Sequence, residues 1–266
     1  MRGQNLVCQI QKNLVSLLRK IKMYIYFNRI DILTLTVFSM AAIILLLGTQ
    51  PAFTQIDSRL KADGWKEFTF DDKKQNIFKR VGEDIVEIQT HSSVSIAYMP
   101  FDGETLDLRD TPTLAFEWQH EGQIIDTDVS KKGGDDRILA IYLAFPYQAE
   151  HASFKEKLMR PLVVASQGQD APGRLLTYIW AGAPEVGRWF ENPYTGKAGY
   201  MQVIQGADDA TNNPDIWRQH KVNIAQDFKD RFGYFPPTPA YVAIGVDSDD
   251  TNSRAITRVR GLGFVK

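Results

Sequence analysis

The stretch "RILAIYLAF", Arg137 to Phe145, decides the fold class. Side chains of a β-strand point alternately to its two faces, so every second residue shares a face. Both sets are apolar here: Leu139, Ile141, Leu143 and Phe145 form one, and Ile138, Ala140, Tyr142 and Ala144 form the other. A strand that is apolar on both faces must be covered on both sides. The stretch therefore predicts the central strand of a buried sheet.

Further strands are predicted on either side of it by alternation over short segments. In "LAFEWQHE", Leu114, Phe116, Trp118 and His120 share one face, where we expect His120 to be buried and hydrogen-bonded. The other predicted strands are "EDIVEIQT" from Glu83, "VSIAYM" from Val94, "RLLTYIWA" from Arg174, "YMQVIQ" from Tyr200 and "AYVAIGV" from Ala240. The last run, "AITRVRGLGFVK" from Ala255, contains two glycines that break its alternation, so we expect a β-bulge there.

One helix is predicted with its caps. "NIAQDFKDRFGYFPP" places Ile224, Phe228 and Phe232 at four-residue intervals, which puts them on one helical face. Asn223 can cap the start of this helix, and Gly233 can end it. A weaker, single-turn helix is predicted by "FKEKLMR" from Phe154.

Short strands separated by turns rich in Gly, Pro and Asp, with little helix, predict a mainly β fold. We expect an antiparallel β-sandwich or jelly roll with one short helix near residues 223–232. The sequence contains no low-complexity linker and no internal repeat, so residues 54–266 are predicted to form a single domain.

Residues 1–53 predict a leader. The run from Ile32 to Gly48 carries no charge and follows six basic residues. At about 17 residues it is at the lower limit for spanning a bilayer. We expect a secretory signal peptide, with an uncleaved membrane anchor helix as the alternative. The domain is thus predicted to be periplasmic or secreted, or else anchored in the inner membrane and facing the periplasm, with membrane contact only through this segment.

The charge and cysteine content exclude two classes of partner and site. After Ala52 the chain carries 25 basic and 31 acidic residues, and an acidic domain repels phosphate backbones, so no nucleic-acid partner is expected. Cys8 is the single cysteine and lies in the leader. The domain therefore has no disulfide, thiolate metal site or cysteine nucleophile.

Acidic side chains are the first candidates for chemistry. They are Asp135 and Asp136 in "GGDDR", Asp227 in the predicted helix, and the run "VDSDDTNSRA" from Val246. A turn role is expected for part of that run, because Asp, Asn and Ser side chains bond nearby backbone amides. Whether its carboxylates point toward Asp135 and Asp136 is a question for the tertiary structure.

Two functional interpretations of these carboxylates are open. Asp247, Asp249 and Asp250 could hold calcium, which takes six to eight oxygen ligands from flexible loops. They match only the first half of an EF-hand loop, without its glycine and final glutamate. Alternatively, Asp135 or Asp136 could pair with Asp247 for acid/base catalysis of glycoside hydrolysis.

Tryptophan and tyrosine residues are the second candidates. Trp118 and Trp180 alternate with other large apolar residues and are predicted to fill the core. Trp189 and Tyr194 lie in "GRWFENPYTGKAGY", a predicted loop rich in Tyr, Asn and Gly. We therefore expect these two residues, together with Asp135, Asp136, Asp227 and Asp247, to contact a ligand.

Several enzyme classes have no supporting motif. The four histidines show no metal-ligand spacing, which disfavours a zinc hydrolase. The sequence contains no G-x-S-x-G elbow, P-loop or dinucleotide fingerprint.

The motifs "EWQHE", "GGDDRILAIYLAF", "LLTYIWAG" and "WRQHKVNIAQDFKDRFGYFPPTPAYVAIGVDSDDTNSRA" together resemble domain-of-unknown-function family 3047. The resemblance covers the chain from about Trp65 to the C-terminus. It implies export and a jelly-roll fold akin to carbohydrate-binding modules, and it implies no activity. Members often carry an acid, arginine and asparagine where this chain has His220 to Asn223, which puts a role for that charged pair in doubt here.

Three functions are compatible with the sequence. The first is non-catalytic binding of a saccharide or another cell-envelope ligand. The second is an envelope glycoside hydrolase or lyase that uses paired aspartates. The third is a structural domain whose loops are ordered by calcium. The sequence leaves open whether the protein is an enzyme, and no cofactor other than calcium is expected.

Overall fold

The computed structural model describes residues 55–101, 106–169, 171–207 and 216–266. The predicted leader, residues 1–53, lies outside them. Phe53–Lys266 forms one compact unit. Within the described ranges, no helix combines the length and apolar character needed to cross a bilayer.

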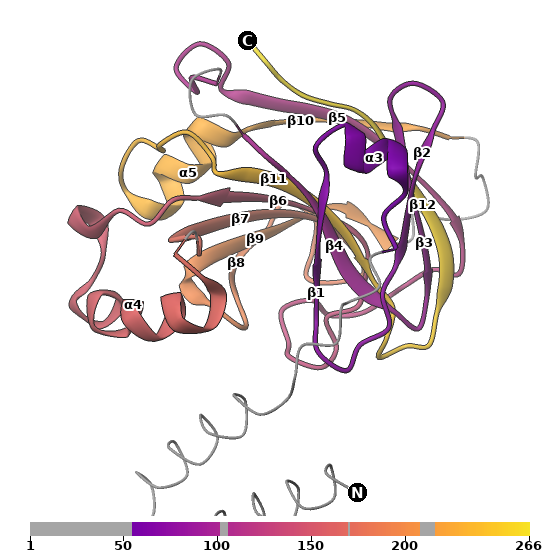
Figure 1. Ribbon diagram of the computed structural model, residues 1–266, viewed down its shortest axis with the longest axis horizontal. Helices are drawn as coiled ribbons and strands as arrows, with labels where there is room; N and C mark the ends of the chain where they lie inside the picture. The colour runs from indigo at the N-terminus through magenta and orange to yellow at the C-terminus, as the bar shows by residue number, and fades with distance from the viewer. Residues whose placement is uncertain (1–54, 102–105, 170, 208–215) are drawn as a thin grey trace, which may run out of the picture. The chain divides into compact units, whose positions relative to one another are not determined.

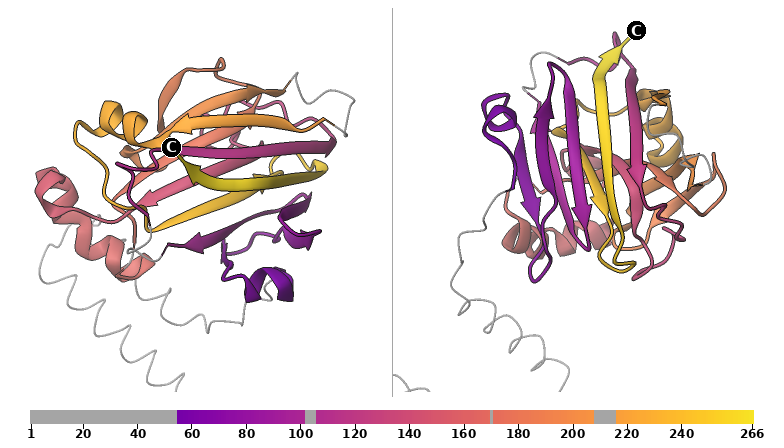
Figure 2. Two further views of the ribbon diagram at one scale, coloured as in Figure 1. Left: turned by 90° about the horizontal axis from the view of Figure 1, so that it is seen from above. Right: turned by 90° about the vertical axis from the view of Figure 1, so that its right-hand side faces the viewer.

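The fold is a sandwich of two β-sheets, as Figures 1 and 2 show. The seven-stranded sheet has, in spatial order, β1 (Lys66–Thr69), β4 (Val94–Pro100), β11 (Tyr241–Asp247), β6 (Arg137–Phe145), β7 (Arg174–Ala181), β9 (Gly196–Gly206) and β8 (Trp189–Asn192). The five-stranded sheet has β10 (Arg218–Asn223), β5 (Thr113–Gly122), β12 (Arg254–Val265), β3 (Ile85–His91) and β2 (Ile77–Val81). The predicted mainly β sandwich is confirmed. One strand pair, β7 with β9, departs from the predicted antiparallel arrangement and is parallel.

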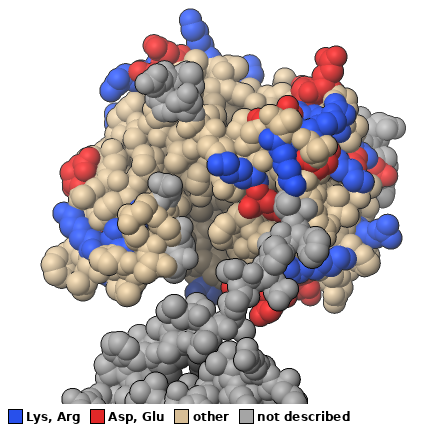
Figure 3. Space-filling view, viewed as in Figure 1, with Lys and Arg blue, Asp and Glu red and all other residues tan. Residues whose placement is uncertain are grey.

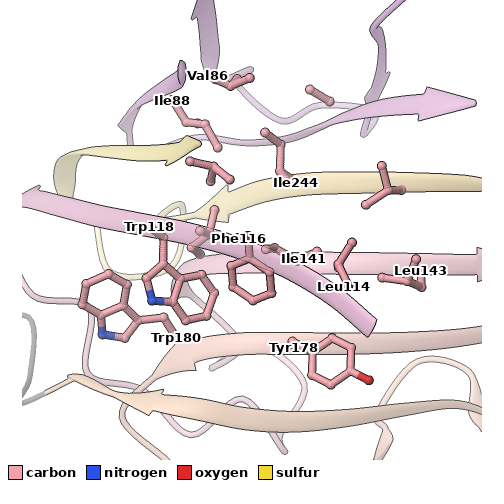
Figure 4. Packing of buried hydrophobic residues seen from close by; sticks show 14 of the residues in the cluster. Val86, Ile88, Leu114, Phe116, Trp118, Ile141, Leu143, Tyr178, Trp180 and Ile244 are labelled. Atoms are coloured by element: carbon pink, nitrogen blue, oxygen red, sulfur yellow. The ribbon is translucent and has the colours of Figure 1, made fainter. Parts of the chain in front are cut away.

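The main core lies between the two sheets. Every residue of β6 is buried, which confirms it as a central strand. Trp118 and Trp180 are fully buried and stack with ring centroids 5.4 Å apart, as predicted for core residues (Figure 4). His120 is buried as expected, with Nε2 2.9 Å from the carbonyl oxygen of Gln123.

The helices differ in number and length from the prediction. Helix α5 (Ile224–Phe232) is capped by Asn223 and ends at Gly233, whose φ of 85° suits glycine, so this helix is confirmed. Helix α4 runs over Phe154–Gln167, about three turns beyond the single turn predicted, and Ser153 and Glu156 form a capping box at its start. A five-residue helix, α3 (Ser58–Ala62), was not predicted.

Four strands were missed. Strands β1 and β2 are short, and β10 reads as a polar run in the sequence. The segment around Trp189 was expected to be a loop, but it forms β8, which pairs with β9 across a turn that contains Tyr194. Short edge strands gain their order from pairing with a neighbour, so their own alternation is weak. The predicted bulge in the last strand is confirmed, between Arg260 and Gly263.

The seven-stranded sheet also has an outer face, turned away from the other sheet. Its buried members include Ala140, Tyr142, Ile179, Met201 and Ala243, and they form a hydrophobic cluster distinct from the main core. They alternate along their strands with residues of that core, as the period of two requires. This outer face positions the candidate site.

Candidate functional site

The two aspartate segments meet where β6 begins and β11 ends. These strands are antiparallel neighbours, and Arg137 is paired in register with Asp247. One carboxylate oxygen from each of Asp136, Asp247 and Asp249 lies within 4.8 Å of the others. We call Asp135, Asp136, Asp247 and Asp249, with Arg137 between them, the acidic cluster. The sequence predicted its four aspartates but not Arg137, and the strand pairing brings them together.

Asp136 orders the turn that follows β11. Its Oδ2 accepts hydrogen bonds from the backbone N–H of Thr251 at 2.7 Å and from the Thr251 hydroxyl at 2.6 Å. Its Oδ1 accepts the backbone N–H of Asp250 at 3.3 Å. The residue is 1% exposed. A carboxylate from just before the neighbouring strand β6 therefore orders this turn, whereas the sequence predicted a turn role for side chains of the run itself.

Arg137 holds the cluster together. Its Nη2 lies 3.2 Å from Asp247 Oδ2, and its Nη1 lies 3.5 Å from Asp135 Oδ2. The same guanidinium donates from Nη1 to the backbone carbonyl of Asp135 at 2.7 Å and from Nε to the Tyr142 hydroxyl at 3.1 Å. A guanidinium that is buried in this position requires such partners, because an unpaired buried charge costs much free energy.

Asp247 has the most perturbed carboxyl group of the cluster. Burial raises the pKa of Asp247 to about 7, the nearby charges of Asp136 and Asp135 add to the rise, and Arg137 opposes it. Asp247 is 6% exposed, and within the described part of the chain its Oδ1 has no hydrogen-bond donor. An acceptor-only oxygen buried beside other carboxylates needs a proton or a cation to offset the repulsion.

The carboxylates within reach of one metal ion differ from the predicted set by one residue. Asp247 and Asp249 belong to it, but the third is Asp136 rather than Asp250. Asp250 is exposed and meets the cluster through its backbone N–H. Asp249 is ion-paired with Lys73 from the segment between β1 and β2. A cation already lies at that edge of the cluster.

Tyr194 joins the cluster from the turn between β8 and β9. Its hydroxyl donates to Asp135 Oδ1 at 2.7 Å, and partial burial together with this bond raises the pKa of Tyr194 to about 12. Asn192 holds the turn, because its Oδ1 accepts the backbone N–H groups of Tyr194 and Thr195. Tyr194 and Asp135, predicted separately as ligand contacts, are thus in direct contact.

Trp189 and Asp227 belong to a different group, centred on Tyr178. The Tyr178 hydroxyl donates to Asp227 Oδ2 at 2.7 Å, and burial raises the pKa of the Asp227 carboxyl. The Trp189 ring packs edge-on against Tyr178, with centroids 5.8 Å apart, and the Arg231 guanidinium lies over the Trp189 ring at 5.5 Å from its centroid. Tyr178 points into the main core, so these contacts attach β8 and α5 to the sandwich. The structure does not bring Trp189 or Asp227 to the acidic cluster.

Sequence reasoning missed a set of aromatic residues on the outer face. Phe68 of β1 pairs in register with Ile96, and Tyr98 of β4 lies on the same face. The Tyr98 and Tyr241 rings are 5.3 Å apart, and both residues are partly exposed. Phe68 is 51% exposed. We call Phe68, Tyr98 and Tyr241 the aromatic row. The sequence contains one indication of this row, because Tyr98 and Tyr241 lie within two of the strands that alternation predicts.

The aromatic row and the acidic cluster lie on one face. Every second side chain of β11 points to the outer face, and these residues are Tyr241, Ala243, Gly245 and Asp247. Asp247 therefore lies on the same side of the sheet as Tyr241, about 20 Å away. Figure 3 shows the molecule hollowed between the part that carries α4 and the part that carries β1, with walls made mostly of uncharged residues. Such a surface can accept a long ligand that has apolar faces and polar edges.

The geometry bears on the hydrolase interpretation. Glycosidase carboxyl pairs are about 5–5.5 Å apart in retaining enzymes and about 6.5–9.5 Å apart in inverting ones, and they flank the substrate. Oxygens of Asp136 and Asp247 lie within 4.8 Å, and both residues are buried. Asp136 also accepts three hydrogen bonds from the turn that follows β11. This arrangement favours a structural role for Asp136 over proton transfer to a substrate.

Comparison with known proteins gives a family and weak structural likenesses. The family model described as "Protein of unknown function (DUF3047)" matches residues 63–262. No match was found among curated proteins.

Among the solved structures that match the fold are two xyloglucanases. A family 12 xyloglucanase from Bacillus licheniformis, in complex with ligand, matches with a TM-score of 0.38 and 8% identity, over 75% of this chain and 96% of its own. The xyloglucanase domain of NopAA, a type three effector from Sinorhizobium fredii in complex with cellobiose, matches with a TM-score of 0.37 and 9% identity, over 76% of this chain and 97% of its own. Likeness at this level carries no argument about activity or ligand.

Proposed function

Since the chain belongs to the family described as "Protein of unknown function (DUF3047)", whose description states no activity, we propose a function from its own residues. The protein is an exported domain that binds a saccharide of the cell envelope on the outer face of the seven-stranded sheet, without catalysis. Export is supported by the leader, in which basic residues precede an uncharged run.

The observation that carries this proposal is the aromatic row. Aromatic rings of soluble domains are usually buried, because each contributes a large apolar area. Here Phe68 is half exposed at the edge of the sheet, and Tyr98 and Tyr241 follow it toward the centre. Pyranose rings have flat apolar faces of C–H groups that stack on such side chains. Neighbouring rings along one sheet face suit a chain of sugars better than a single small ligand.

The acidic cluster supplies the polar end of this surface. Sugar hydroxyls need both donors and acceptors, and the exposed residue Tyr194 offers its hydroxyl beside the Asp135 carboxylate. Their mutual hydrogen bond and the Arg137 contact fix them before a ligand arrives, which lowers the entropy cost of binding.

Replacing an aromatic-row residue should weaken binding strongly. We expect Tyr98→Ala and Tyr241→Ala each to reduce affinity for an envelope saccharide by about tenfold or more, as is typical for an interface anchor. An array of peptidoglycan fragments and envelope polysaccharides identifies a ligand. Titration calorimetry then measures the dissociation constant of that ligand for each variant.

Phe235→Ala is the matched control, because Phe235 is also an exposed aromatic residue but lies in the 233–240 loop. It should bind like the unmodified protein. If the folded protein binds no envelope saccharide, or if all three variants bind equally well, the proposal is wrong.

A second candidate function, structural ordering by calcium, is favoured by one observation. Three carboxylates converge within 4.8 Å, and carboxylate oxygens are the ligands that calcium prefers. The ion would join the beginning of β6 to the turn after β11 and would replace the proton or cation that Asp247 Oδ1 needs.

Calcium should then raise the thermal midpoint. At a concentration 100 times its dissociation constant, a ligand adds about 2.7 kcal/mol, which is worth about 5–10 °C for a domain of this size. Calorimetry in calcium and in EDTA measures the shift. Asp249→Asn should abolish it, whereas Asp230→Asn, at an exposed position of α5, should not. Equal midpoints in calcium and EDTA would exclude this role.

A further inference from the structure

Helix α4 has its polar and apolar sides inverted relative to an ordinary surface helix. Its inner side is fixed to the domain by polar contacts. Glu156 forms an ion pair with Arg174 at 2.5 Å. Arg160 donates to the backbone carbonyl of Ala171 at 2.7 Å, and its guanidinium lies over the Tyr147 ring at 4.5 Å.

The outer side of α4 carries an exposed apolar stripe. Phe154, Leu158 and Leu162 are spaced four residues apart and are 82%, 66% and 62% exposed. Ala165 continues the stripe at the C-terminal end of the helix and is also exposed. Single exposed apolar residues are ordinary, but a continuous row of them on one helix marks a contact surface. The helix lies at the periphery of the domain, beyond the ends of β6 and β7, as Figures 1 and 2 show.

Two lysines flank this stripe. At about 100° per residue, Lys155 and Lys157 lie on opposite sides of the line through Phe154, Leu158 and Leu162. Both are exposed, and the one acidic residue of the helix, Glu156, is turned inward to Arg174. The outward surface of α4 is therefore apolar at its centre and positive at both edges, on a domain whose net charge is negative.

We infer that this surface of α4 binds an anionic lipid bilayer. An apolar stripe enters the boundary between headgroups and acyl chains, while flanking lysines extend to the phosphates. Charge decides between the possible occupants. A second copy of α4 would oppose the same lysines to each other, and the leader run from Ile32 to Gly48 carries no charge to complement them.

The distance from the leader to the domain is compatible with this contact. Only six residues separate Gly48 from Gln55, where the described domain begins. Fully extended, they reach about 25 Å. An uncleaved leader would hold the domain within that distance of the bilayer, and a cleaved leader would leave α4 as the means of attachment.

A fluorophore placed on the stripe tests the inference in the full-length protein. Cys8 is the single native cysteine, so Cys8→Ser allows one label at Ala165→Cys on the stripe. The environment-sensitive dye NBD at this position should shift its emission to the blue and brighten several-fold with vesicles of phosphatidylglycerol and phosphatidylethanolamine. Lys229→Cys, on the exposed side of α5, is the control, because a protein tethered only by its leader would show the same response at both positions.

The lysines predict a dependence on lipid charge. In protein labelled at Ala165→Cys, Lys155→Gln and Lys157→Gln should each lower the affinity for the vesicles by about fivefold. This is the effect of one basic residue at an anionic surface. No shift at Ala165→Cys in protein that sediments with the vesicles would overturn the inference. A shift that depends on protein concentration without vesicles would also overturn it, because it would identify a second copy as the partner.

Discussion

Replacing Arg137 with methionine is expected to lower the free energy of unfolding by about 3–5 kcal/mol, the cost typical of removing one partner from a buried ion pair. The guanidinium lies between Asp135 and Asp247, and the loss leaves both carboxylates without their shared cation. Methionine keeps much of the side-chain volume, so the effect reports mainly on charge. Urea denaturation at pH 8 measures the change through the midpoint at constant slope.

Arg188→Met is the control for this experiment. Arg188 forms an ion pair with Glu185 at 3.4 Å, and both side chains are exposed. Exposed pairs contribute about 0–1 kcal/mol, so this variant should be nearly neutral. The loss in the Arg137 variant should also be smaller at pH 5 than at pH 8, because a protonated Asp247 no longer needs the cation. Equal midpoints for the two variants would contradict the role assigned to Arg137.

The second large effect is a dependence of stability on pH that Asp247→Asn removes. The folded pKa of Asp247, about 7, is raised from its ordinary value of 3.8, so the folded state binds a proton more tightly than the unfolded state does. The stability that this proton contributes is fully present below about pH 4 and is lost as the pH rises through 7. Across that window the change is on the order of 4 kcal/mol.

Urea denaturation in EDTA between pH 5 and pH 8.5 measures this dependence. EDTA keeps divalent cations from replacing the proton. The unmodified protein should lose stability over the range, and Asp247→Asn should lose much less. Asp107→Asn, at an exposed position in the 106–111 loop, should keep the original slope of unfolding free energy against pH. If the Asp247 and Asp107 variants show the same slope, another group carries the dependence.

Most of the fold followed from alternation in the sequence. β6, β7 and β11 are central strands with both faces covered, so each carries an apolar pattern that needs no neighbour to be recognised. The edge strands β1 and β8 were missed, because pairing with one neighbour specifies them more than their own residues do. Helix α4 was underestimated because its apolar side faces outward, whereas its inner face is held by Glu156 and Arg160.

The candidate site was predictable in its members but only partly in its grouping. Asp135, Asp136, Asp247 and Asp249 were all identified as candidates because they are carboxylates beside predicted strands, and they meet because β6 and β11 are antiparallel neighbours. Asp227 was identified as an acid in the predicted helix and Trp189 as an aromatic residue in a predicted loop, yet they lie around Tyr178. Residue type marks a side chain as able to act, but it does not say which other side chains lie beside it.

The sequence by itself determined the sandwich, the two core tryptophans, the capped helix α5 and the family, because each depends on local periodicity or on a linear motif. The tertiary structure alone decided that Arg137 bridges Asp135 and Asp247, and that Phe68 and Tyr98 share a face with Tyr241. Those relations depend on which strands are neighbours and in what register. A shift of one residue in that pairing would turn every side chain of the strand to the opposite face.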